Sequence, residues 1–99
     1  IQAAINTVLE SFKGFGNCTL TELWYEEKQS NRVIESYMQT GRGAYNGAQP
    51  ENVIVLFSHF NTADNAPGGL SSNMRYTDWN WILVRESKDA PWKLDDCGY

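Results

Sequence analysis

The second half of the chain holds three β-type segments in succession, with no helical pattern between them. Residues 53–60 form a nearly continuous apolar run, 74–86 alternate around large rings, and 92–99 alternate again. Turn-forming residues at 61–73 and 87–91 mark the two connections. Strands joined by a surface loop and by a tight connection, with no helix between them, predict antiparallel hairpins and exclude a doubly wound parallel sheet, which needs a helix between successive strands.

The first half adds helical patterns around one further strand. Apolar residues recur at intervals of three and four over 1–13, which predicts an amphipathic helix. Residues 18–28 alternate and predict a strand whose exposed end carries the charged residues 26–28. Asn31 is predicted to cap a short second helix. The pattern therefore predicts one α+β domain over 1–99, an antiparallel sheet with one face covered by the N-terminal helix.

The charge and hydropathy of the chain exclude two classes of partner. Twelve acidic residues outweigh eight basic ones, and the net charge is −4. The basic residues are scattered and form no stripe, so we expect no binding to nucleic acid. No apolar run approaches about 18 residues, so any membrane attachment would require an N-terminal signal or lipid anchor preceding Ile1.

Aromatic side chains are the densest feature of the sequence, with four Trp, five Tyr and four Phe residues. Large rings fill the core of a small domain efficiently, and they also suit a hydrophobic cleft. Alternation places Trp79 and Trp81 on one face of their strand and Ile82 and Val84 on the other. The candidate ligand-binding residues are Trp24, Tyr25, His59, Trp79 and Trp81.

Candidates for catalysis are few. His59 is the only histidine, and it would need a pocket partner such as Asp78 or Tyr25 to act in proton transfer. One histidine is too few for a zinc site, so we expect no metal and no cofactor. Asp95 and Asp96 are adjacent on a predicted strand and are expected to point to opposite faces, which argues against a carboxylate pair.

The two cysteines are far apart in sequence and belong to no metal-binding motif. Cys18 and Cys97 form a disulfide in one interpretation, in an oxidising compartment, and remain two buried free thiols in the other.

Two stretches of the chain resemble one bacterial family. One comprises Trp79-x-Trp81-Ile-Leu-Val-Arg85-Glu86, a Lys-Asp-Ala turn and Pro91-Trp92-Lys-Leu-Asp95-Asp96-x-Gly98-Tyr99. The other is Gly41-Arg42-Gly43 followed by Glu51-Asn52-Val53-Ile54-Val55. Both are similar to a domain of unknown function in secreted proteins and lipoproteins of Gram-positive bacteria, within the nuclear-transport-factor-2-like superfamily. Cys97 departs from the pattern, because similar sequences more often carry a bulky or polar residue there.

The resemblance implies a cone-shaped α+β fold, a curved sheet wrapped against helices, and an extracellular or envelope-anchored location. It brings no assigned reaction. We expect a non-enzymatic binding or accessory module for a small ligand, peptide or envelope protein, with any cavity between the helix at 1–13 and the sheet. The alternatives are an isomerase- or dehydratase-like enzyme that uses a pocket acid or His59, and a homodimeric assembly module.

Overall fold

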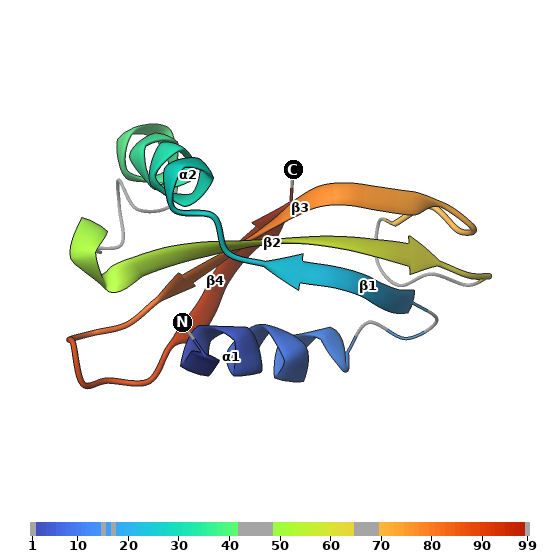
Figure 1. Ribbon diagram of the computed structural model, residues 1–99, viewed down its shortest axis with the longest axis horizontal. Helices are drawn as coiled ribbons and strands as arrows, with labels where there is room; N and C mark the ends of the chain where they lie inside the picture. Colours follow the sequence, from blue (N-terminus) through green and yellow to red (C-terminus); the bar gives the residue numbers. More distant parts are fainter. Residues whose placement is uncertain (1, 15, 17, 42–48, 65–69, 99) are drawn as a thin grey trace.

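The computed structural model describes residues 2–14, 16, 18–41, 49–64 and 70–98. The elements in chain order are α1 (Gln2–Phe12), β1 (Cys18–Trp24), α2 (Glu27–Thr40), the 3-10 turn η2 (Pro50–Asn52), β2 (Val53–Thr62), β3 (Arg75–Val84) and β4 (Lys93–Gly98) (Figure 1). Of the Gly41-Arg42-Gly43 stretch, only Gly41 lies within the described residues.

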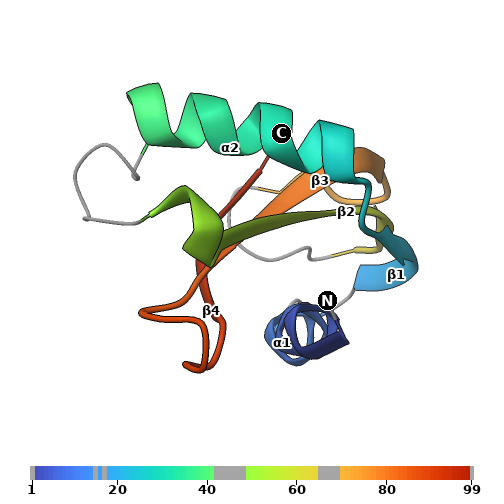
Figure 2. The same cartoon turned by 60° about the vertical axis from the view of Figure 1, so that its left-hand side comes forward.

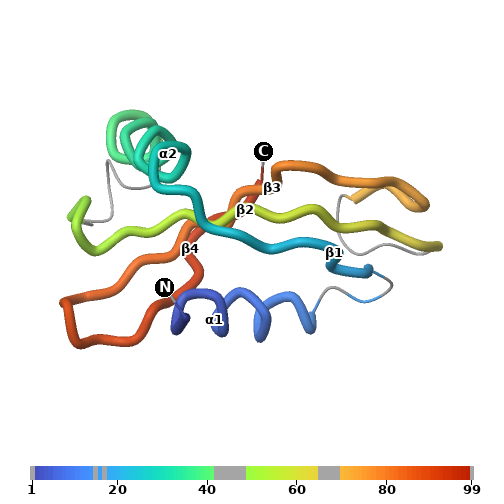
Figure 3. The backbone as a smooth tube through the Cα atoms, in the orientation of Figure 1, coloured from blue at the N-terminus to red at the C-terminus, as the bar shows by residue number. Residues whose placement is uncertain are grey.

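The strands form one antiparallel sheet in the order β1-β2-β3-β4, so each strand pairs with its neighbour in sequence. The backbone trace shows the twist of this sheet (Figure 3). The predicted α+β class is confirmed, with the N-terminal helix packed on a curved antiparallel sheet. This arrangement is compatible with a nuclear-transport-factor-2-like cone.

The two helices lie on opposite faces of the sheet (Figures 1 and 2). On one face α1 packs over a core that we call the α1-side core, with the buried members Ala4, Val8, Ile54, Leu56, Trp81 and Leu83. The other face carries the α2-side core, with the buried members Tyr37, Val53, Val55, Phe57 and Ile82. Alternate residues of β2 and β3 thus enter different cores, as the period of a strand requires.

A β-bulge interrupts the register of each strand pair. β1 gains one residue at Thr21, β3 gains one at Thr77–Asp78, and β4 gains Asp95. The bulges in β1 and β3 both lie opposite His59 of β2, and Asp78 adopts a left-handed φ of 54° there. Because bulges increase local twist and bend, these two favour a bend of the sheet at His59.

The second helix begins earlier than the sequence predicts. β1 ends at Trp24, and Glu26 caps α2, because its carboxylate accepts hydrogen bonds from the amides of Lys28 (3.2 Å) and Gln29 (2.6 Å). A carboxylate at this position satisfies the free amides and complements the helix dipole. The predictions of a strand to residue 28 and of a cap at Asn31 are therefore wrong, and Asn31 lies inside the helix.

Candidate functional site

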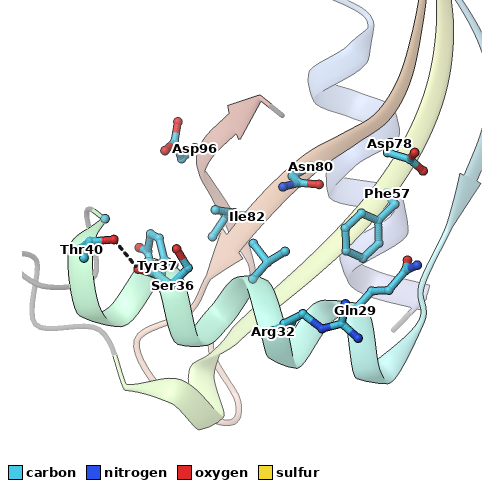
Figure 4. A pocket seen from close by; sticks show the side chains of 12 residues that line it. Gln29, Arg32, Ser36, Tyr37, Thr40, Phe57, Asp78, Asn80, Ile82 and Asp96 are labelled. Atoms are coloured by element: carbon cyan, nitrogen blue, oxygen red, sulfur yellow. Dashed lines mark hydrogen bonds between the residues drawn. The ribbon is translucent and has the colours of Figure 1, made fainter.

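An open groove of about 550 Å³ lies between α2 and the β3–β4 half of the sheet (Figure 4). Its helical wall comprises Gln29, Arg32, Val33, Ser36, Tyr37, Thr40 and the following Gly41. Its sheet wall comprises Phe57, Asp78, Asn80, Ile82 and Asp96. The apolar side chains line its floor, and polar groups stand on both walls.

The groove exists because one helix is too narrow to cover four strands. A helix is about 10 Å across, which matches roughly two strands at a spacing of about 4.8 Å. Buried Ser30 fixes α2 over β2, since its Oγ accepts the Val55 amide at 3.1 Å. Tyr37 ties the helix to β4, because its hydroxyl donates to the Asp95 carboxylate at 2.6 Å. The β3–β4 half of this face is left without a helix above it.

Polar side chains on the groove walls are free to bind a ligand. Within the described part of the chain, the side chains of Gln29, Arg32, Asp78 and Asn80 have no hydrogen-bond partner. Figure 4 shows Gln29 and Arg32 on α2 across Phe57 from Asp78 and Asn80 on β3. This end of the groove therefore offers a guanidinium, two amides and a carboxylate, which recognise both charged and neutral polar groups.

The sequence leaves open whether a cavity lies between the N-terminal helix and the sheet, and the structure has aromatic rings in this space. Phe12 packs edge-on against Phe60 and Trp81, with ring centroids 5.7 and 6.2 Å apart. Trp81 is fully buried, and its indole N–H donates to Ser58 Oγ at 2.8 Å. The groove instead faces α2, on the face opposite to these packed rings.

Trp79 and Trp81, two of the predicted ligand-binding residues, lie on the α1 side and do not reach the groove. Trp79 packs edge-on against Phe60 and Tyr76, at 5.4 Å from each ring centroid. The predicted separation of these two rings from Ile82 and Val84 is confirmed, since the latter belong to the α2-side core.

Of the three catalytic candidates, His59 contacts only the backbone of Asp78, the Asp78 side chain lines the groove without His59, and Tyr25 lies elsewhere. His59 Nδ1 accepts the backbone N–H of Asp78 at 3.2 Å, and His59 Nε2 lies 3.9 Å from the Glu22 carboxylate. The Trp24 ring, another ligand-binding candidate, lies 4.7 Å from the imidazole. Tyr25 packs on the α1-side core. His59 therefore stabilises the β3 bulge, because one of its ring nitrogens accepts the backbone N–H of Asp78.

Asp95 and Asp96 do not point to opposite faces. Asp95 is the extra residue of the β4 bulge and binds Tyr37 of α2, while Asp96 lines the groove beside the same helix. The bulge breaks the alternation on which the prediction depends, so both carboxylates reach the α2 side. Asp96 also accepts the Cys97 amide at 2.9 Å.

Both cysteines are free thiols, but each is only half-buried, whereas the second interpretation of the sequence expects buried thiols. Cys18 lies in β1 and Cys97 in β4, the opposite edges of the sheet. Three strand spacings separate these edges, roughly 14 Å, and a disulfide needs Cα atoms within about 7 Å. The fold therefore excludes a disulfide within one chain. Burial raises the pKa of the Cys18 thiol.

Most of the groove residues are absent from the sequence predictions. Two periodic patterns contain them: the polar series Gln29, Arg32, Ser36 and Thr40 at helical spacing, and the alternating series Asp78, Asn80 and Ile82. Each pattern is also typical of a solvated surface, and only the packing of α2 over β2 turns the two into facing walls.

Two further features concern the described part of the chain. It contains no group of three or more His, Cys, Asp or Glu side chains placed to hold a metal ion. None of its helices combines the length and the apolar character that a membrane crossing requires.

The fold and the groove define a small α+β domain in which a four-stranded antiparallel sheet separates two helices. A comparison with known families matches residues 3–98 to Domain of unknown function (DUF4829), so the chain belongs to that family. Searches of curated proteins and of solved structures gave no significant match.

Proposed function

We propose that this domain is a non-enzymatic binding module that takes its ligand in the groove beside α2. The observation that carries the proposal is the groove itself, about 550 Å³ with unpartnered polar side chains on facing walls. This volume lies within the range of small-molecule sites in proteins, and such sites combine an apolar floor with a few polar groups.

The enzymatic alternative receives less support from the geometry. Proton transfer in a pocket needs an acid or base that faces the substrate together with a second polar group. His59 is absent from the groove lining, and Tyr25 lies on the far side of the sheet. Asp78 alone of the three catalytic candidates lines the groove.

The assembly alternative would require a continuous exposed apolar surface. Among the described residues, the exposed large hydrophobic side chains are those of Leu9 and Met74, on separate elements. A binding role remains the better supported proposal.

The setting of the domain is also part of the proposal. The resemblance of the segments around Trp79–Glu86 and Pro91–Tyr99 supports an exported protein of Gram-positive bacteria, at the envelope or outside the cell. The curved sheet, being compatible with a cone, supports a place in the nuclear-transport-factor-2-like superfamily.

The proposal is tested by screening a library of small molecules and short peptides against the ¹⁵N-labelled domain by NMR. Ligands are expected to shift amide signals of α2 and β3 around the groove, and Ser36→Trp is expected to abolish these shifts by filling it. Asn31→Trp is the matched control, because Asn31 is exposed on the same helix outside the groove. Hits that shift only other surfaces, or that bind Ser36→Trp unchanged, would refute the site.

A further inference from the structure

We infer that the ligand of the groove is an extended peptide segment carrying two basic side chains four residues apart. This inference rests on the proposed function and adds the chemistry of the ligand. It draws on three independent features, which are the charge of the walls, their spacing and the size of the groove.

The charges on the groove walls favour a cationic ligand. Asp78 and Asp96 stand on the sheet wall, and Arg32 is the basic residue of the lining. No ion pair within the described residues neutralises either carboxylate. Two carboxylates against one guanidinium, on a chain with net charge −4, attract basic groups.

The two carboxylates are spaced like residues i and i+4 of an extended chain. Asp78 precedes Ile82 by four residues in β3, and Ile82 pairs with Asp96. Four residues of strand span about 13 Å, and an extended peptide covers the same distance between residues i and i+4. Figure 4 shows Asp78 near Gln29 at one end of the groove and Asp96 at the other. Two basic side chains at this spacing emerge on one side of an extended peptide and can reach both carboxylates.

The groups between the carboxylates suit a peptide backbone. Asn80 lies between Asp78 and Ile82 on the same face of β3, with a free side-chain amide that both donates and accepts. Gln29 and Arg32 face it from α2 and offer further donors to peptide carbonyls. A volume of about 550 Å³ exceeds the needs of a single amino acid and accommodates several residues lying in an open groove.

The spacing gives a sharp test with two peptides of identical composition. Fluorescence anisotropy at low salt compares labelled, end-blocked Lys-Ala-Ser-Ala-Lys with its isomer Lys-Ala-Ser-Lys-Ala. The isomer places its basic side chains three residues apart, hence on opposite sides of an extended chain. We expect the first peptide to bind more tightly, by about two- to fivefold, which is the scale of one partly exposed ion pair.

Variants of the protein test whether the carboxylates of Asp78 and Asp96 bind the basic side chains of the peptide. Asp78→Asn and Asp96→Asn are each expected to lower the affinity for the first peptide by about two- to fivefold. Each should also remove the difference in affinity between the first peptide and its isomer. Asparagine is suitable at position 78, because it tolerates the left-handed backbone there. Asp89→Asn is the matched control, since it removes the same charge from the exposed β3–β4 connection and is expected to change nothing.

The outcomes separate this inference from the proposed function. Equal binding of the two peptides, or binding unaffected by Asp78→Asn and Asp96→Asn, overturns the peptide assignment. If the peptides do not bind, but library ligands bind and Ser36→Trp abolishes their binding, the proposed site is supported and the ligand class is wrong. If neither peptides nor library ligands bind there, both proposals fall.

Discussion

The two faces of the sheet are built from the same strands but differ in how they are closed. On the α1 side, large rings interlock beneath the helix, with Phe60 stacked on Tyr76 at 5.1 Å and edge-on to Trp79. On the α2 side, aliphatic residues and Phe57 form the core under the helix, and the remaining width of the sheet stays open. On the α1 side, bulky rings extend beyond the helix and cover the sheet. On the α2 side no such rings do so, and a groove is left.

The difference between the two faces is visible along the single strand β3. Alternate residues of β3 contribute Trp79, Trp81 and Leu83 to the α1-side core. The intervening positions contribute Asp78, Asn80 and Ile82 to the groove. Substitutions at neighbouring positions of β3 should therefore have very different effects, on stability for one set and on binding for the other.

The largest expected effect follows from Trp81 on the closed face. Trp81→Ala should lower the free energy of unfolding by about 3–5 kcal/mol, because it leaves a cavity and an unpaired Ser58 hydroxyl. Asn80→Ala, one position away on the groove wall, should change it by less than about 0.5 kcal/mol. Denaturant titration of both variants measures the difference.

If Trp81→Ala is too unstable to purify, Trp81→Phe supplies the measurement. It keeps a ring in the core but removes the N–H that donates to Ser58 at 2.8 Å. A smaller loss than that of the alanine variant, yet clearly above that of Asn80→Ala, is expected. Equal stabilities for Trp81→Phe and Asn80→Ala would contradict the contrast between the two faces.

A smaller effect is expected where the open face is held in place. Tyr37→Phe removes the hydrogen bond from the Tyr37 hydroxyl to the partly buried Asp95 carboxylate and should cost about 1.5–3 kcal/mol, the range for bonds to charged groups. Tyr25→Phe is the control, a tyrosine packed on the α1-side core, and should cost less than about 0.5 kcal/mol. Similar losses of stability for the two variants in thermal unfolding would mean that the Tyr37–Asp95 hydrogen bond between α2 and β4 contributes little.

The start of α2 gives a third, smaller effect. Glu26→Ala removes the carboxylate that caps two amides and should destabilise the domain by about 0.5–1 kcal/mol. Asn31→Ala should leave stability unchanged or raise it by a few tenths, because alanine is the better residue inside a helix. Denaturant titration that ranks Asn31→Ala as the more harmful change would restore the cap predicted from the sequence.

The sequence predicts the fold better than the site. Periodicity identifies the N-terminal helix and the order of the strands, and alternation separates Trp79 and Trp81 from Ile82 and Val84, because these features depend on local pattern. The helix start at Glu27 is missed, because a Glu cap resembles the charged end of a strand.

The site is harder to predict, because it depends on tertiary packing. The side on which a groove forms depends on how far α2 covers the sheet, and Ser30 binding Val55 sets that position. The bulge at Asp95 reverses the orientation expected from alternation, and no residue pattern marks it in advance. The β3 bulge brings the backbone amide of Asp78 to His59, whereas the sequence suggests a partnership through the Asp78 side chain.

The smallest expected effect tests whether the two faces influence each other through β4. Cys97 packs on the α1-side core, and its neighbour Asp96 lines the groove. Burial raises the pKa of the Cys97 thiol and the Asp96 carboxylate raises it further, against an opposing contribution from Trp79. Because the fold favours the neutral thiol, this contribution to stability is present below the ordinary thiol pKa and is lost as the pH rises through the raised value.

Asp96→Asn removes the charge but keeps an oxygen that can accept the Cys97 amide, so the thiol pKa should fall towards its ordinary value. In a Cys18→Ser background, the rate of alkylation of Cys97 at pH 8 should rise by about twofold, because the thiolate is the reactive form. Asp89→Asn should leave the rate unchanged. An unchanged rate for Asp96→Asn would mean that the charge of the Asp96 carboxylate does not affect the Cys97 thiol on the α1 side. A basic peptide bound at Asp96 would then leave Cys97 unaffected, and the two faces would act independently.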